Sequence, residues 1–227
     1  MQFTLLLMLL FDLSYSYLMD SPLAQTARRR KPYGIRRRRW DREQLTWRLD
    51  TKNINAGDEY ILRNTLHRAF GEWQAVSSIS FSEKEDDGLT DLVVAFERGK
   101  HADEFPFDGK DGIVAHAFFP RDGRLHFDAD EDWTLNSPYG VNLFQTAVHE
   151  VGHLLGLPHS KDPTAVMNVA KKPYDPDFRL GEDDIQAVQR LYPMEDKETS
   201  PSNPNTFPFA LPSAALRYQR QFHFLKL

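Results

Sequence analysis

The sequence predicts one mixed α/β domain flanked by tails at both ends. Short apolar segments of strand length lie in the first half of the chain, and three longer stretches repeat apolar residues at the helical period of about 3.6 residues. The chain has 227 residues, of which 41% are hydrophobic and 12% aromatic. That composition suits a single buried core.

The first half of the chain alternates strands with one helix. Residues 45–49 alternate apolar and polar side chains, as a half-buried strand does. Residues 79–81 and 92–96 are further strands, the second apolar enough to lie inside a sheet. Residues 58–75 are the first helix, and its apolar stripe consists of Ile61, Leu62, Leu66, Ala69, Phe70 and Trp73.

The second half contributes two more predicted helices. Residues 141–155 are the first of them and residues 180–192 the last. The last helix carries acids in its first turn, where negative charge favours the helix dipole. We expect the folded domain to end near Pro193.

A zinc site is predicted on the helix 141–155. His149 and His153 are four residues apart, so both imidazoles lie on one helix face. Gly156 can end the helix and turn the chain, which lets His159 become the third ligand. Three histidines leave one position of a tetrahedral zinc open, as in catalytic sites. Glu150 is then the candidate general base, taking the proton of a zinc-polarised water and passing it to the leaving amine. The alternative is a chance pattern of surface histidines, which so specific a motif makes improbable.

A second group of metal-binding side chains lies between residues 101 and 133. Three histidines and an aspartate there would close a tetrahedral zinc and leave no position for substrate: His101, Asp103, His116 and His126. Four acids supply the hard oxygens that calcium prefers: Asp108, Asp111, Asp128 and Glu131. The alternative is a polar loop with ordinary histidines. The two zinc sites, however, use six of the eight histidines in the chain.

The N-terminal residues predict secretion to the extracellular space or matrix. Residues 1–11 are an apolar run of signal-peptide length, and small residues follow at 14–16, so we predict a signal peptide over 1–16. A membrane anchor or a buried segment is the alternative. The chain has no cysteine, so bound metals rather than disulfides would stabilise a secreted domain.

Two basic runs follow, at 28–31 and 36–39, and predict a short basic pro-segment over 17–39 that a basic-site convertase cleaves. The alternative is a solvated run that attracts polyanions. The net charge of −5 gives no reason to expect nucleic acid as a partner. Residues 194–227 are a Pro-rich linker and tail, with no function that the sequence assigns.

These motifs together resemble the catalytic domain of the matrix metalloproteinases, which are metzincin zinc endopeptidases. The resemblance rests on the extended motif 149–159, on Met167 after it, and on the His-x-Asp, Asp-Gly, Ala-His-Ala and His-Phe-Asp segments before it. It covers about residues 33 to 193. It implies a twisted, mostly parallel five-stranded sheet with three helices, a catalytic domain over 40–193, and a zinc cleft between a large upper and a small lower part.

The resemblance also implies roles for individual residues. By position, the catalytic zinc would be bound by His149, His153 and His159. The structural zinc would be bound by His101, Asp103, His116 and His126. Calcium would be bound by Asp108, Gly109, Asp111, Ile113, Asp128 and Glu131, with the glycine and the isoleucine contributing their backbone carbonyls. Extended polypeptide substrates would lie beside an edge strand near 113–117, with a hydrophobic side chain entering a pocket behind the zinc. We expect a monomer that proteinaceous inhibitors can bind.

The chain departs from the family pattern at several points. The cysteine of the latency motif is absent. The loop 120–125 is shorter than in the family, which weakens the case for a second calcium site with Asp91 as its candidate ligand. After Met167, Asn168 and Val169 replace the usual Tyr-Pro. The alternatives to a peptidase are a non-catalytic, metal-stabilised module that binds peptides and a truncated or misfolding variant. A mere binder would not need Glu150.

Overall fold

A computed structural model describes residues 39–85, 88–170 and 172–194. The predicted signal peptide, nearly all of the basic segment and the C-terminal tail lie outside these residues. Within them, no helix is both long and apolar enough to cross a membrane.

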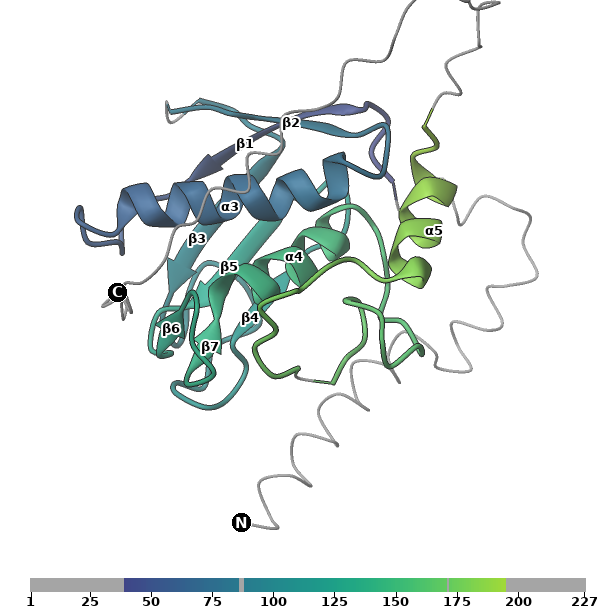
Figure 1. The fold of residues 1–227 in the computed structure, drawn as a ribbon. Coiled ribbons are helices and arrows are strands. Elements are labelled where there is room, and N and C mark those ends of the chain that lie inside the picture. The colour runs from purple at the N-terminus through teal and green to yellow at the C-terminus, as the bar shows by residue number, and fades with distance from the viewer. Residues whose placement is uncertain (1–38, 86–87, 171, 195–227) are drawn as a thin grey trace, which may run out of the picture.

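A twisted five-stranded sheet forms one layer of the domain (Figure 1). Its strands are β1 (Gln44–Leu49), β2 (Ser80–Glu83), β3 (Leu92–Glu97), β4 (Ala115–Ala117) and β5 (Arg124–Asp128). Their order is β2-β1-β3-β5-β4. The pairs β1/β2, β1/β3 and β3/β5 are parallel, and only β4 runs antiparallel, at the edge beside β5. A separate pair, β6 (Trp133–Thr134) and β7 (Val141–Asn142), is also parallel.

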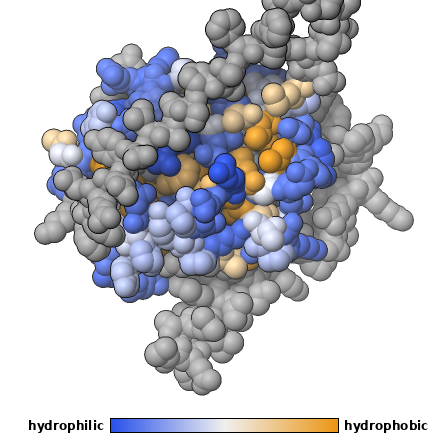
Figure 2. Space-filling view, viewed as in Figure 1, coloured by the Kyte–Doolittle hydropathy of each residue, from blue (hydrophilic) through white to orange (hydrophobic). Residues whose placement is uncertain are grey.

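Two helices, α3 (Glu59–Gln74) and α4 (Leu143–Leu154), pack against each other over this sheet (Figure 1). The predicted stripe of α3 is the buried one, because Leu62, Leu66, Ala69, Phe70 and Trp73 are all at most 2% exposed. Each fully buried large apolar side chain stabilises the fold by about 1.5–3 kcal/mol. Hydrophobic residues also show near the middle of the face in Figure 2, around α4, with hydrophilic residues about them.

The third helix, α5 (Glu182–Leu191), closes the described chain after the irregular segment that follows α4. The structure therefore confirms the predicted sheet and the three helices. The second predicted helix begins at Leu143 instead of residue 141. Val141 and Asn142 pair with Trp133 and Thr134 instead, and the Asn142 side chain accepts a hydrogen bond from the backbone of Gln145.

Candidate metal centres

Helix α4 places two of the histidines on one face. Its apolar residues are buried in the core, with Val148, Val151 and Leu154 fully covered. His149 and His153 lie one turn apart and are only partly covered, so their rings meet at the helix surface with centroids 4.9 Å apart. The helix then ends, and Gly156 adopts φ +100°, a conformation that side chains rarely tolerate.

The turn at Gly156 brings His159 back to the helix. Nε2 of His159 lies 3.2 Å from Nε2 of His153. Nδ1 of His149 donates to the Val166 carbonyl at 2.7 Å, and Nδ1 of His153 donates to the Leu157 carbonyl at 2.8 Å. These bonds orient both rings and leave the Nε2 lone pairs pointing into the space between the three histidines.

This arrangement fits a tetrahedral metal. Two ligand atoms that each lie about 2.0–2.1 Å from a tetrahedral zinc are roughly 3.3 Å apart. The Nε2 atoms of His153 and His159 are 3.2 Å apart, which is close to that separation. Burial lowers the pKa of His149 to about 4 and holds that of His153 well below its usual range, so both rings are neutral, as metal ligands must be.

Glu150 lies beside the first ligand in an unusual environment. It is 7% exposed, and its Oε2 is buried with no hydrogen-bond partner among the described residues. Burial raises the pKa of Glu150 to about 8 in the metal-free domain. A divalent cation nearby favours the carboxylate and opposes this rise. A buried, unpartnered carboxyl group next to a metal-ligand cluster is typical of a proton-transfer group rather than of a structural one.

Met167 packs against α4 at Gly152, next to His153 in the sequence. It is 2% exposed, and its sulfur packs so closely on Gly152 that a side chain at residue 152 would overlap it. Gly152 lies inside α4, where glycine is otherwise unfavourable. Its identity is therefore explained by the methionine that it admits beside His153. Gly152 was not among the predicted site residues, although a glycine inside a predicted helix is a signal of close packing.

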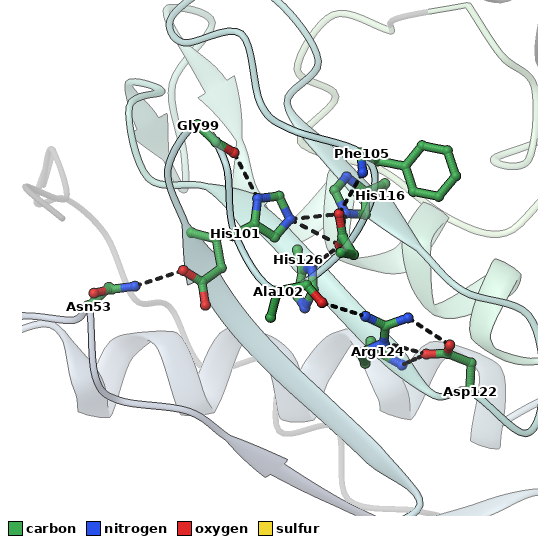
Figure 3. Close-up of polar contacts among 11 residues, drawn as sticks. Asn53, Gly99, His101, Ala102, Phe105, His116, Asp122, Arg124 and His126 are labelled. Carbon is green, nitrogen blue, oxygen red and sulfur yellow. Dashed lines mark hydrogen bonds and ion pairs between the residues drawn. The ribbon is translucent and has the colours of Figure 1, made fainter.

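The second histidine cluster forms where β4 pairs with β5. His116 and His126 are direct cross-strand partners in that antiparallel pair, so their side chains lie on the same face. His101 and Asp103 come from the loop after β3, and Figure 3 shows His101 turned toward His116 and His126. The Gly99 carbonyl accepts a hydrogen bond from Nδ1 of His101 at 2.8 Å, which leaves Nε2 facing the cluster.

The Asp103 carboxylate lies at the centre of this cluster. Its Oδ2 is 2.8 Å from Nδ1 of His126, 2.9 Å from Nε2 of His116 and 3.0 Å from Nε2 of His101. Burial would raise the pKa of Asp103, but the surrounding histidines and a backbone N–H outweigh it and lower the pKa to about 2. Burial lowers the pKa of His126 to about 4. One carboxylate oxygen and three imidazoles are the donor set of a closed zinc site.

These two clusters are the groups of three or more possible metal ligands in the part of the chain that the structure describes. The acids predicted for calcium do not form such a group there, but two loops that carry them lie together. The Asp111 N–H donates to Oε1 of Glu131 at 2.9 Å, and the Ile113 N–H donates to Oδ1 of Asp108 at 2.7 Å.

Asp128 gives the strongest sign of a cation near these loops. It is fully buried, and its Oδ2 has no hydrogen-bond partner among the described residues. Burial raises the pKa of Asp128, and the charges of Asp130 and Asp108 add to the rise. Gly109, with φ +82°, and Asp111, with φ +68°, shape the facing loop. A buried carboxylate oxygen without a donor fits a hard cation such as calcium.

Asp91, the candidate for a second calcium site, already has protein partners. Its Oδ2 accepts from the Thr46 N–H at 2.9 Å and from the Thr46 hydroxyl at 3.0 Å, and Oδ1 lies 3.2 Å from the Arg42 guanidinium. The sequence alone did not identify these partners, since they come from a strand about 45 residues away.

Residues 39–193 match the family model described as Matrixin. The chain is 39% identical over 188 residues to matrix metalloproteinase-16 of Homo sapiens, which covers 78% of this chain and 31% of that protein. It is 40% identical over 194 residues to matrix metalloproteinase-15 of Homo sapiens, covering 80% of this chain and 29% of the relative. It is 42% identical over 156 residues to the hatching enzyme of Paracentrotus lividus, covering 67% of this chain and 26% of that protein. The chain thus spans about a third or less of these relatives.

Proposed function

The chain belongs to the matrixin family, and we propose that it is a metalloendopeptidase that is secreted and cuts extracellular proteins, including proteins of the extracellular matrix. The observation that carries the peptidase activity is a three-histidine group, two of whose members lie on α4, beside Glu150, whose Oε2 is buried without a hydrogen-bond partner among the described residues. The family implies zinc, and His149, His153 and His159 are the residues that would hold the catalytic ion.

A zinc ion held there would act as a Lewis acid toward the scissile carbonyl and the attacking water. The chain's own residues supply the rest of the chemistry. The Glu150 carboxylate takes the proton of the attacking water and delivers it to the nitrogen of the leaving amine. The Val166 and Leu157 carbonyls hold the His149 and His153 rings in place through both steps, since each accepts the Nδ1–H of its ring.

The edge strand β4 is the proposed docking site for substrate. It pairs with β5 on one side only, and it lies near α4. An extended polypeptide can therefore add to its free edge by backbone hydrogen bonds, which would lead the scissile bond toward the histidines of α4.

We propose structural roles for the remaining ions. The cluster of His101, Asp103, His116 and His126 would hold a zinc that ties the loop after β3 to the sheet. Calcium would join the loop 108–113 to Asp128 and Glu131. Both ions would stabilise the sheet edge on which substrate docks, without taking part in proton transfer.

The rival function is a metal-stabilised module that binds peptides without cutting them. Zinc stoichiometry and cleavage of a quenched fluorescent peptide library, measured on wild type and on Glu150→Gln, distinguish the two. If the protein is a peptidase, the wild-type protein cuts the library and Glu150→Gln does not, while the two proteins hold the same amount of zinc. A wild-type protein that holds two zinc ions and binds but never cuts the library would support the rival. Secretion is tested by expressing the full chain and asking whether the product in the medium lacks residues 1–16.

A further inference from the structure

Arg39 and Trp40, the first two residues that the structure describes, are hydrogen-bonded to the C-terminal ends of α5 and α4. A guanidinium nitrogen of Arg39 donates to the carbonyl of Leu191, the last residue of α5, at 2.8 Å. The same guanidinium lies 5.7 Å from the centre of the Tyr192 ring. A cation at this position satisfies a carbonyl that the helix end leaves free and favours the helix dipole. Arg39 is also the last residue of the basic run 36–39.

Trp40, the next residue, belongs to the core. It is 7% exposed, and its indole N–H donates to the carbonyl of Leu154, the last residue of α4, at 2.8 Å. Its backbone N–H donates to the Tyr192 hydroxyl at 2.9 Å. That hydroxyl is completely buried and in turn donates to the Leu155 carbonyl at 3.0 Å. Tyr192 thus joins the start of the domain to the end of the helix that carries His153.

A few residues after Trp40, the chain enters the sheet. Strand β1 begins at Gln44, and the Glu43 carbonyl accepts the Ser80 N–H at 2.8 Å. A protease takes its substrate as an extended segment and needs the residues on both sides of the bond that it cuts. Access to the bond between Arg39 and Trp40 requires that Trp40 leave the core and that three hydrogen bonds break.

We infer that the Arg39–Trp40 bond, although it follows four consecutive arginines, is closed to proteases in the folded domain, and that Arg39 is retained as the residue that caps α5. Removal of the basic segment then ends before Arg39, which shortens the predicted pro-segment at its C-terminal boundary. Cleavage of a bond that must open first follows the population of the open form. This inference rests on the packing of residues 39, 40 and 192 and is independent of the proposed peptidase activity.

Limited trypsin digestion followed by mass spectrometry tests the inference, because trypsin cuts after any accessible arginine. The substrate is the full zinc-loaded chain carrying Glu150→Gln, which prevents self-digestion, and the reference is a synthetic peptide of residues 34–46. We expect the fragment that begins at Trp40 to form at least about a hundredfold more slowly from the folded chain than from the peptide, which corresponds to about 2.7 kcal/mol. Equal rates from chain and peptide would overturn the inference.

A matched pair of variants tests the role of Tyr192. Tyr192→Phe removes the hydroxyl that bonds Trp40 and Leu155, and we expect it to speed formation of the Trp40 fragment at least about tenfold. Tyr60→Phe is the control, since Tyr60 is 79% exposed, and it should match wild type. If Tyr192→Phe fails to fold, hydrogen exchange on the wild-type chain replaces it. The Trp40 indole and backbone N–H groups should then exchange as slowly as the core amides of α4, and fast exchange of both would overturn the inference.

Discussion

Replacing His126 with alanine should destabilise the domain without altering its chemistry. His126 is 5% exposed on β5, and its Nδ1 lies 2.8 Å from Asp103. The substitution leaves two histidines and one carboxylate, so a closed four-ligand site becomes an open three-ligand site.

The magnitude follows from mass action. Where free zinc exceeds the Kd about 1,000-fold, binding stabilises the folded state by about 4.1 kcal/mol. If loss of one ligand raises the Kd about 1,000-fold, the remaining stabilisation is only about 0.4 kcal/mol. The difference of roughly 3.7 kcal/mol corresponds to a fall in Tm of about 7–15 °C for a domain of this size.

The assay is thermal unfolding with and without a zinc chelator, together with peptide turnover well below the Tm. Wild type should lose more Tm on chelation than His126→Ala does, while kcat at low temperature changes little. His67→Ala is the control. The His67 side chain is 53% exposed on α3 and pairs with Glu83, so its change in stability should stay within about 1 kcal/mol and should be the same with and without the chelator. If His126→Ala has the same Tm as wild type but a much lower kcat, the cluster around Asp103 takes part in catalysis and the structural assignment is wrong.

Three further predictions concern the catalytic helix and the ions. Glu150→Gln should lower kcat by roughly a hundredfold to ten-thousandfold with unchanged zinc content, because the base is not a ligand, and retained turnover would exclude its role. The metal-free domain should lose stability as pH falls from about 7 toward 4, measured by urea unfolding. Burial lowers the pKa of His149 and His126 to about 4 from the usual 6.5, so these two groups make the unfolded chain bind more protons in that window. Glu150 acts in the opposite direction, because burial raises its pKa to about 8. The profile is therefore measured in Glu150→Gln, where a flat profile would contradict the prediction. Removing calcium should lower the Tm of wild type, and Asp128→Asn should abolish that calcium dependence. A calcium response that survives in Asp128→Asn would locate the ion elsewhere.

The catalytic cluster could be predicted from sequence because its geometry is local. The spacing of His149 and His153 determines their common helix face, and Gly156 supplies the turn to His159. The structural cluster is not local, since His116 and His126 meet only through the register of two strands. The sequence still predicted that these four residues share a site, because the side chains that bind zinc are chemically few and the two predicted zinc sites use six of the eight histidines. The structure brings the four residues together, and zinc there stays a prediction. The parallel pair β6/β7 was missed because two-residue strands carry no periodicity.

What the sequence could not predict is how the polar groups around the sites find partners. Asp183 and Asp184 are adjacent acids on the last helix, and the sequence alone does not tell which of them would pair with a newly formed N-terminus. The structure separates them: Asp183 accepts from the Ser160 hydroxyl at 2.6 Å, whereas Asp184 is buried and accepts the backbone N–H groups of Val166 and Met167. Asp184 therefore holds the backbone whose Val166 carbonyl orients the His149 ring and whose Met167 side chain packs on Gly152. Loss of that carboxylate would leave buried donors without partners, at a cost of about 1–3 kcal/mol for each. An exposed salt bridge to a new N-terminus would contribute about 1 kcal/mol or less. The larger contribution of α5 to the site is thus made inside the core, by a residue that differs from its neighbour only in the direction it faces on the helix.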